Sequence, residues 1–382
     1  MNLSEYLRTF TRRVRWLSDG LTPEKLWHAG CAAASYALGR ETSAAWPLAL
    51  KIDISPACNL KCPVCVHAEP GDDDLLVRQD FAQKRMSVDH FRTIVEEVRG
   101  HVSALSLYYV GDPYAHPEVD EMCRIASDAG LNTHANSNFS FRFTDERIRR
   151  IVESGLTHLT VCVDGFSQES YSRTRINGRL DFVLSNLERV CSVRRQLGRC
   201  FPRVEVQFIK FPHNVHELEK AIAWFGDVGV DSVEHYWGMV SNYADLEPSR
   251  YAVGEPLPRR MLPRCHWPYD SMVIRYDGEV IPCCNFRHAT QYVPSEDGRS
   301  FGNVFSLGVK AVWDSAIYRQ TRRLVADPGA FLGDPVAEGH FCHGCPALFA
   351  TTQKENIKMA PEFDVAGKRV ISLMPVEIRP DP

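Results

Sequence analysis

The sequence has little net charge and no long apolar run. Its 382 residues carry 44 Lys and Arg against 48 Asp and Glu, a formal net charge of -4. Because the arginines are interspersed with acids and form no basic stripe, we expect no nucleic-acid partner. A membrane-spanning helix needs roughly 20 consecutive apolar residues, and no segment reaches that length. We therefore also expect no membrane association.

The N-terminus lacks the features of a secretory signal. The stretch "MNLSEYLRTFTRRVRWLSDG" is amphipathic and has neither the continuous apolar core nor the small-residue cleavage site of a signal peptide. We therefore expect a cytoplasmic protein, whose thirteen cysteines stay reduced rather than forming a disulfide framework. Cysteines that cluster in such a chain are candidates for metal or iron-sulfur ligation.

Six β-rich runs alternate with amphipathic helical runs in the first two thirds of the chain. The runs are 48–54, 104–110, 131–137, 158–164, 203–209 and 231–237. Several of the helical runs between them open on an N-cap residue and close on Gly. This alternation predicts an α/β fold, a parallel sheet with right-handed crossovers that forms a partial (β/α)6 TIM-like barrel. Barrel chemistry lies at the C-terminal ends of the strands.

The alternation of β-rich and helical runs stops near residue 250. A Pro-rich linker is followed by a hairpin signal at Tyr276, Asp277 and Gly278 and by a helical run near 310–325. We therefore predict four parts. They are an N-terminal helical segment (1–47), the α/β core (48–250), a small C-terminal module (251–350) and a tail (351–382) with a strand-like "RVISLMP".

Three cysteines directly follow the first predicted strand. The stretch "SPACNLKCPVC" places Cys58, Cys62 and Cys65 at the spacing C-x3-C-x2-C. Three thiolates can hold three irons of a cubic four-iron cluster and leave the fourth iron open to another ligand. A structural zinc site would need a fourth protein ligand, for which His67 is the nearest candidate. The spacing alone leaves both interpretations open.

A second group of cysteines lies in the C-terminal module. Cys265, Cys283, and the "CHGC" pair Cys342 and Cys345 offer four thiolates. Four thiolates suit a four-iron cluster ligated entirely by protein, although Cys-x2-Cys pairs also occur in zinc ribbons. Cys284 is adjacent to Cys283 and cannot easily ligate the same cluster, so we expect it to be a bystander.

The motif "CNLKCPVC" after a first strand resembles the signature of radical S-adenosylmethionine (radical SAM) enzymes. Three further segments resemble that family in the same order. They are "YVGDPYAHPE" for its GGEP segment, "NSNFS" for its TNG turn, and "CVDGFSQESYSRTRINGRLDFVLSNL" for its SxDG stretch with Tyr and Arg. The resemblance covers residues 48 to roughly 350. It implies that SAM chelates the open iron through its methionine amino and carboxylate groups.

The resemblance also implies which residues bind SAM. The GGEP-like segment, which includes Val110, contacts the SAM amino group in the family, and the later acid and arginine help bind its ribose or carboxylate. The implied cofactor-binding residues are Gly111, Asp112, Pro113, Ser137, Asn138, Asp164 and Arg175. Two positions depart from the family pattern: Val64 replaces an aromatic residue near the adenine, and Asp112 replaces Glu.

The C-terminal cysteines resemble the start of a SPASM module. The later ligands of a full module are absent after Cys345, so the resemblance implies the shortened Twitch-type domain with one auxiliary 4Fe-4S cluster on Cys265, Cys283, Cys342 and Cys345. The implied cofactors are this cluster, the SAM-binding 4Fe-4S cluster on Cys58, Cys62 and Cys65, and SAM.

The family resemblance implies an enzyme that cleaves SAM reductively, with an electron donor such as flavodoxin or ferredoxin. The resulting 5'-deoxyadenosyl radical abstracts hydrogen from the substrate. The resemblance to Twitch relatives with four auxiliary ligands favours a small polar natural product as the substrate. This would be a sugar or aminocyclitol of antibiotic biosynthesis, and the reaction would be a dehydrogenation or an epimerisation. One alternative is a radical SAM enzyme that modifies peptides in RiPP maturation. Another is a non-catalytic iron-sulfur or zinc scaffold.

Several residues are candidates for roles in catalysis. Cys162 and Cys284 are candidate hydrogen donors by analogy with radical SAM epimerases, and burial as small core residues is the alternative. Cys162 lies two residues before Asp164, so both should face the barrel interior. Candidates for substrate contact at the end of the sixth strand are His235, Tyr236 and Trp237, with core packing as the alternative. The remaining cysteines, which we expect to be structural, are Cys31, Cys123, Cys191 and Cys200.

Overall fold

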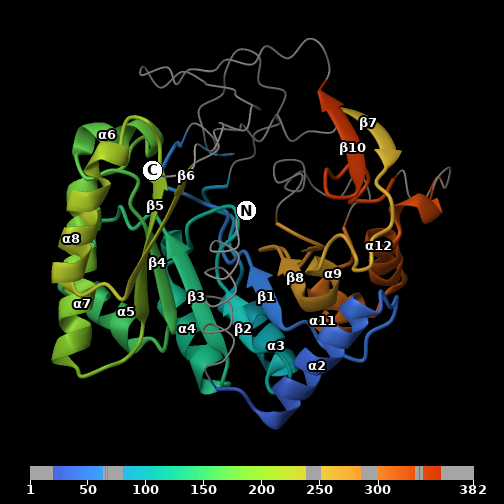
Figure 1. The fold of residues 1–382 in the computed structure, drawn as a ribbon. Helices are drawn as coiled ribbons and strands as arrows, with labels where there is room; N and C mark the ends of the chain where they lie inside the picture. The colour runs from blue at the N-terminus through green and yellow to red at the C-terminus, as the bar shows by residue number, and fades with distance from the viewer. Residues whose placement is uncertain are drawn as a thin grey trace.

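The structure is a computed structural model, and Figure 1 shows its fold. It describes residues 20–62, 65, 67, 81–237, 251–284, 300–331, 335 and 339–353. Among these residues, no helix is both long enough and apolar enough to cross a bilayer.

The helices and strands follow one another in the predicted alternation as far as β6. In chain order they are α2 (Pro23–Ala37), β1 (Ala49–Ile52), α3 (Val88–Val98), β2 (Ala104–Ser106), η1 (Pro113–Ala115), α4 (Val119–Asp128), β3 (Asn132–Ser137), α5 (Asp145–Glu153), β4 (His158–Cys162), α6 (Gln168–Thr174), α7 (Leu180–Gln196), β5 (Arg203–Lys210), η2 (Val215–Glu217), α8 (Leu218–Val228) and β6 (Ser232–Trp237). The C-terminal part has β7 (Tyr251–Pro256), α9 (Trp267–Asp270), β8 (Ser271–Ile274), β9 (Val280–Ile281), α10 (Val304–Leu307), α11 (Val309–Trp313), α12 (Ala316–Ala326), η7 (Pro328–Phe331) and β10 (Phe349–Gln353).

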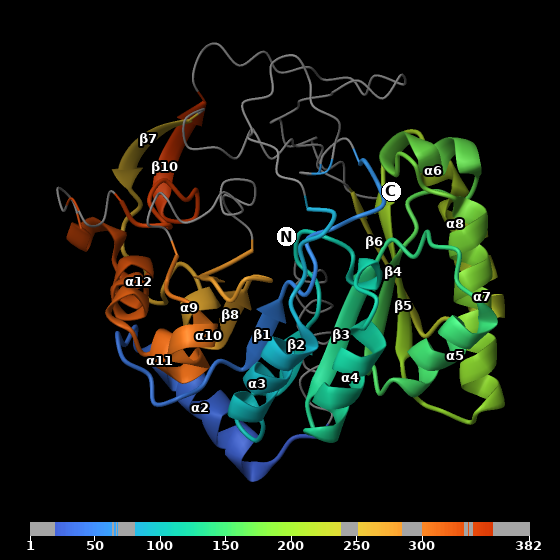
Figure 2. The same cartoon turned by 180° about the vertical axis from the view of Figure 1, so that it is seen from behind.

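One eight-stranded sheet joins both parts of the chain. Its order is β6-β5-β4-β3-β2-β1-β8-β9, and β1 to β6 are parallel throughout. This confirms the predicted partial barrel. The sheet then continues into the C-terminal module, because β8 pairs in parallel with β1 from Ala49↔Ser271 to Ile52↔Ile274. The two cysteine regions are thus attached to neighbouring strands (Figure 2).

Side-chain alternation gives the sheet two different faces. On β5, Val204, Val206 and Phe208 are fully buried in the core shared with the helices. Burying each such side chain stabilises the fold by about 1.5–3 kcal/mol. The intervening residues face the opposite, concave side. There β5 places Glu205 and Gln207, so the interior side of the barrel is largely polar.

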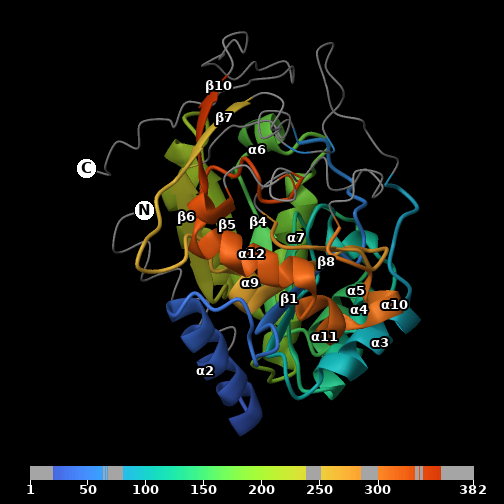
Figure 3. The ribbon, with the colours of Figure 1, turned by 90° about the vertical axis from the view of Figure 1, so that its right-hand side faces the viewer.

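The C-terminal module packs beside β1 and α2 (Figure 3). Its β8–β9 hairpin confirms the turn predicted at Tyr276, Asp277 and Gly278, with Gly278 at φ +85. The indole of the buried Trp313 donates to Ala45 O at 2.9 Å, and Tyr36 donates to Pro263 O at 3.0 Å. These contacts fix the module against the N-terminal helical segment.

Two sequence-based interpretations of the C-terminal part are wrong in detail. The predicted Pro-rich linker contains β7, which pairs with β10 in an antiparallel ladder that also crosses the predicted 350/351 boundary. The single helical run near 310–325 is two helices, because Ser315 is extended and caps a new helix, accepting from Tyr318 N. Both features depend on tertiary partners that local patterns do not show.

The prediction of an N-terminal helical segment can be compared with the structure only in part. Helix α2 begins where Thr22 caps it and Pro23 follows, as helix starts prefer. Residues 1–19 and the strand-like "RVISLMP" lie outside the described residues. The four domain boundaries as a whole stay predictions.

Candidate functional site

The first three cysteines lie in the loop that leaves β1. Cys58 Sγ accepts from Leu60 N at 3.4 Å, and Cys65 N donates to Cys62 O at 3.1 Å. Burial raises the pKa of the Cys58 thiol well above its ordinary value, and Asp112 and Cys65 add to the effect. Burial likewise raises the pKa of Cys62 to about 11, which the nearby Arg175 partly offsets. The loop thus gathers three partly buried thiols at one site.

The GGEP-like segment packs directly on this cysteine loop. A Cβ on Gly111 would lie 2.3 Å from the carbonyl oxygens of Ser55 and Ala57, and Asp112 N donates to Ala57 O at 2.8 Å. No side chain other than hydrogen fits at residue 111. Glycine is therefore what allows the end of β2 to approach the cluster loop.

The carboxylate of Asp112 is already fully hydrogen-bonded within the protein. Its carboxylate accepts from Tyr114 N at 3.0 Å, from Ser137 Oγ at 2.9 Å and from Asn138 N at 2.8 Å. Burial raises the pKa of Asp112 to about 6, and these bonds limit the rise. The side chain therefore ties the segment after β2 to the end of β3. Pro113 begins η1 immediately after it.

Asn138 connects the TNG-like turn to the first cysteine. Its Nδ2 donates to Asn59 Oδ1 at 2.9 Å and lies 3.7 Å from Cys58 Sγ. Asn59 in turn donates to Ser140 O at 2.8 Å. Asn138 thus orients the cysteine loop, a role that the sequence did not show.

Asp164 and Arg175 form a buried ion pair beside the same loop. Arg175 donates to Asp164 Oδ2 through Nη2 at 2.6 Å and through Nε at 2.7 Å. The other carboxylate oxygen accepts from Ile209 N at 2.9 Å. Since Arg175 also bonds with the Cys62 side chain, the structure brings the predicted SAM-binding pair next to a predicted iron ligand.

Cys162 lies on the concave side of the sheet, as its spacing from Asp164 predicted. Its Sγ donates to Asn136 Oδ1 at 3.0 Å. Burial raises the pKa of Cys162 to about 12, so the group remains a thiol. Thr160, two residues earlier, contacts His134 at 2.8 Å and donates to Glu205 at 3.2 Å.

The other candidates for catalytic roles lie in different places. At the end of β6, Tyr236 is paired with Ile209, and His235 with Phe208. Alternation therefore puts Tyr236 on the concave side and His235 on the opposite one. Lys210 Nζ lies 5.1 Å from the Trp237 ring centroid. Trp237 is only partly buried and does not belong to the hydrophobic core formed by the described residues.

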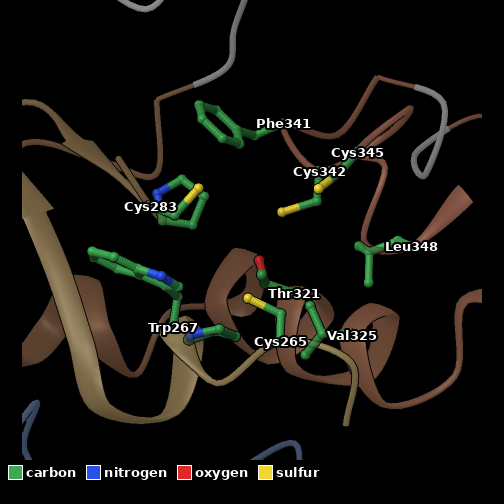
Figure 4. A pocket seen from close by; sticks show the side chains of 11 residues that line it. Cys265, Trp267, Cys283, Thr321, Val325, Phe341, Cys342, Cys345 and Leu348 are labelled. Atoms are coloured by element: carbon green, nitrogen blue, oxygen red, sulfur yellow. The ribbon is translucent and has the colours of Figure 1, made fainter. Parts of the chain in front are cut away.

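The four C-terminal cysteines surround one cavity, shown in Figure 4. The cysteines that line it are Cys265, Cys283, Cys342 and Cys345. The remaining lining residues are Trp267, Pro268, Pro282, Thr321, Val325, Phe341 and Leu348, of which only Thr321 offers a hydroxyl. Cys284 is not among them, as predicted from its adjacency to Cys283.

Local structure explains how the "CHGC" pair turns toward the cavity. Gly344 adopts φ +76 between the two cysteines, and Cys345 N donates to Cys342 O at 3.1 Å. The buried His340 accepts from Cys342 N at 3.1 Å and contacts Thr321 Oγ1 at 2.9 Å. His340 therefore holds the backbone of a predicted ligand.

The sulfur atoms of the two cysteine sites are not drawn together as tightly as the ligands of one zinc ion. Thiolates 2.3 Å from one tetrahedral ion lie about 4 Å apart. Among the described residues, no three cysteine sulfurs of either site lie within 4.8 Å of one another; the group that meets this limit is Glu24, His28 and His101. This spacing is compatible with an iron-sulfur cluster, whose cysteine ligands bind different irons.

Sequence reasoning missed a buried carboxyl group at the end of β1. Within the described ranges, neither oxygen of Asp53 has a hydrogen bond of good geometry. Burial raises the pKa of Asp53 to about 8, and Lys51, Arg275 and the Val110 amide offset this only in part. The available signal was a lone acid in the apolar run "LALKIDI", five residues before Cys58.

Comparison with protein-family models agrees with this geometry. The model of the radical SAM superfamily matches residues 52–225, which hold the cysteine loop and most of the parallel sheet. A second model, SPASM, described as an iron-sulfur cluster-binding domain, matches residues 265–346. Its bounds enclose all four cysteines of the C-terminal cavity.

Known proteins resemble the chain at low identity. A tungsten-containing aldehyde ferredoxin oxidoreductase cofactor-modifying protein of Pyrococcus furiosus is 22% identical over 70% of this chain and 81% of its own length. A PqqA peptide cyclase of Bradyrhizobium diazoefficiens is 26% identical over 53% of this chain, which spans about half (51%) of that protein.

A solved structure shares the fold. Streptococcus suis SuiB bound to precursor peptide SuiA superposes with a TM-score of 0.54 at 15% identity, over 78% of this chain and 71% of SuiB. The likeness to SuiB shows a shared fold, and the two family models identify the class and its cofactors. The chain belongs to the radical SAM superfamily, uses SAM and a 4Fe-4S cluster, and carries a C-terminal SPASM domain for auxiliary iron-sulfur binding.

Proposed function

We propose that the protein is a radical SAM enzyme that modifies a peptide. The supporting observation is that a chain with both cysteine sites also resembles a PqqA peptide cyclase. The sequence favoured a sugar or aminocyclitol instead, and the peptide was its alternative. The comparisons support the alternative better than that first choice. The likeness to a cofactor-modifying protein does not point to a sugar either.

We assign the SAM-binding cluster to Cys58, Cys62 and Cys65. These three cysteines would hold a 4Fe-4S cluster that, together with SAM, would supply radical chemistry for hydrogen-atom abstraction. The protein's own contribution is to hold the reacting groups in place. Gly111 lets the segment after β2 approach the loop, and Asn138 orients Cys58.

The charged groups beside the loop match the polar ends of SAM. Asp164 and Arg175 are already paired and buried, so their side chains need little reorganisation when the cofactor arrives. We assign the SAM ribose or carboxylate to this pair. Because Asp112 is saturated within the protein, we assign the SAM amino group to the backbone carbonyls of Val110 and Gly111 rather than to its carboxylate.

The concave face of the sheet suits a substrate rich in amides. Asn136 and Gln207 offer both donors and acceptors there, and Glu205 offers an acceptor. Peptide backbones carry the complementary groups. If the reaction returns a hydrogen atom to the substrate, the Cys162 thiol is the donor that lies on this face; Cys284, by contrast, belongs to the C-terminal module.

The second site fits an electron-carrying role. Four cysteines leave no iron open to substrate, and the mainly apolar lining excludes water. A cluster held there would accept or pass electrons. We propose a flavodoxin or ferredoxin as the external reductant, and therefore a cytoplasmic enzyme.

The proposal is tested by co-expression with short peptides encoded beside the gene, followed by mass spectrometry. We expect one peptide to lose two mass units for each cross-link or oxidation, and to remain unchanged when Cys58→Ala enzyme replaces the wild type. If the enzyme cleaves SAM but changes no peptide, and consumes an aminocyclitol or sugar instead, the peptide assignment is wrong and the first sequence-based choice is right.

A further inference from the structure

Two completely buried tyrosines carry hydroxyl groups that find no hydrogen-bond partner in the described part of the chain. They are Tyr171 on α6 and Tyr318 on α12, each 0% exposed. Neither hydroxyl has a hydrogen-bond partner among the described residues. A buried hydroxyl left unpaired is destabilising, and native proteins rarely tolerate one. Each position therefore calls for an acceptor that the described residues do not supply.

Tyr318 lies on α12 next to the C-terminal cavity, although it is not one of the residues that line it. It shares one face of α12 with Thr321 and Val325, three and seven residues later, and both line the cavity (Figure 4). Its phenol interacts electrostatically with Cys283 and Cys342. The ring packs at 4.7 Å from Trp313 and 5.0 Å from Phe301, measured between centroids. Tight packing on both sides leaves the hydroxyl little freedom to turn away.

Tyr171 occupies the corresponding position at the first site. It lies one helical turn before Arg175, and its phenol interacts electrostatically with Cys62. A Cβ on Gly178 would come within 2.6 Å of Tyr171 Cε1. The turn before α7 therefore holds the ring close, beside the first cysteine loop.

We propose that Tyr171 and Tyr318 each donate an O–H···S hydrogen bond to the iron-sulfur cluster held by the adjoining cysteines, and so raise its reduction potential. Cluster thiolates and sulfides are the acceptors that appear at both places when the clusters are bound. A hydrogen-bond donor to sulfur stabilises the reduced cluster, because that state carries more negative charge than the oxidised one. Burial keeps the pKa of both phenols above its ordinary value, so both stay protonated. The inference rests on the cofactors and not on the identity of the substrate.

The test is a redox titration of each cluster followed by electron paramagnetic resonance, without SAM. Tyr318→Phe is measured in a Cys58→Ala, Cys62→Ala, Cys65→Ala background that keeps the auxiliary cluster. Tyr171→Phe is measured with Cys265, Cys283, Cys342 and Cys345 replaced by Ala. We expect each Phe variant to shift its own cluster to a more negative potential. In resonance Raman spectra, transfer to D2O should shift the Fe–S stretching frequencies less in each Phe variant than in the protein that keeps the tyrosine.

Tyr269 provides a matched control. It is equally buried and interacts with Cys265, but its hydroxyl donates to Arg322 O at 3.1 Å. Tyr269→Phe should leave the auxiliary potential and the D2O shift unchanged. If Tyr269→Phe and Tyr318→Phe change the potential equally, the effect is one of packing and the proposal is wrong.

A shape-preserving substitution covers the case in which a Phe variant fails to load its cluster. 3-Fluorotyrosine at residue 318 or 171 is a more acidic and stronger donor of similar size. We expect it to shift the cluster to a more positive potential. An unchanged potential at both positions would overturn the proposal, whether or not the Phe variants fold.

Discussion

The two cysteine sites use the same ligand but differ in number and surroundings. The loop after β1 brings three thiols among charged and hydrogen-bonding groups, chiefly Asp112, Asp164 and Arg175. The C-terminal cavity brings four thiols into a lining with one hydroxyl and otherwise apolar side chains. The number of protein ligands decides whether one iron keeps an open coordination position. The polarity of the surrounding side chains decides whether the zwitterionic methionine part of SAM can bind beside that iron. The first site is built to bind a small charged cofactor and the second to insulate a cluster.

The largest expected effect comes from removing one ligand at each site in turn. Cys58→Ala should abolish formation of 5'-deoxyadenosine, at least about 100-fold, because the SAM-binding cluster is lost. Cys283→Ala should retain SAM cleavage while losing turnover of the substrate. Chromatographic assay of 5'-deoxyadenosine measures both. Equal loss in the two variants would show that the sites do not have separate roles.

The buried ion pair of the first site gives the next effect. Arg175→Gln leaves the Asp164 carboxylate buried without its partner, which should destabilise the protein by about 3–5 kcal/mol and weaken SAM binding. Arg179→Gln is the control, because its pair with Asp181 is exposed (59% and 55%). Urea unfolding and SAM titration calorimetry distinguish them. Similar behaviour of the two variants would contradict a role for the Arg175 pair in the site.

Gly111 tests how closely the two segments of the first site must approach. Gly111→Ala should destabilise the fold by about 1–3 kcal/mol, the range for overpacked sites, and weaken SAM binding, because the added Cβ meets two carbonyl oxygens. Gly30→Ala, in α2 with nothing within 4 Å of the new Cβ, should instead stabilise by about 0.5–1 kcal/mol. Thermal unfolding measures the sign. A neutral Gly111→Ala variant would show that the segments can separate.

Asp53 predicts a pH dependence of stability at the first site. Its folded pKa of about 8 lies above the ordinary value of 3.8, so the folded state keeps a proton that the unfolded state loses. Stability therefore falls as pH rises from about 4 to about 8 and then levels. Asp53→Asn removes this loss, and its advantage over wild type should grow across that window by up to about 1.4 kcal/mol for each pH unit. Urea unfolding at pH 5, 7 and 9 would contradict the burial argument if the difference stayed constant.

The smallest effects concern the cysteines that are not predicted ligands. Cys162→Ala and Cys284→Ala should both retain the iron content of wild type and the formation of 5'-deoxyadenosine. If either variant abstracts hydrogen but forms no product, that thiol is the hydrogen donor and the reaction is an epimerisation. Loss of iron from Cys284→Ala would contradict the assignment of the auxiliary ligands.

The parts of the molecule that follow local rules could be predicted from the sequence. Alternating strands and helices gave the parallel sheet, and the spacing of Cys58, Cys62 and Cys65 indicated a cluster with an open position. The pairing of β7 with β10 joins residues nearly a hundred positions apart, so no local pattern showed it. The break before α12 depends on one capping serine within an otherwise helical run.

The finer chemistry of the site could not be predicted, because it depends on contacts between distant segments. Family resemblance suggested that Asp112 reaches SAM, but folding brings Ser137 and Asn138 to its carboxylate first. The same resemblance gave no role to Tyr171, and the unpaired hydroxyl becomes visible only when burial is known. Sequence patterns identify which groups take part; packing decides which of their hydrogen bonds remain for a cofactor.

The most direct test of the account is SAM cleavage by the isolated protein. Anaerobically purified and reconstituted protein should contain about eight irons, four for each cluster. With SAM and dithionite it should release 5'-deoxyadenosine, even in the absence of substrate. Full iron content with no 5'-deoxyadenosine would contradict the account and favour a non-catalytic iron-sulfur scaffold.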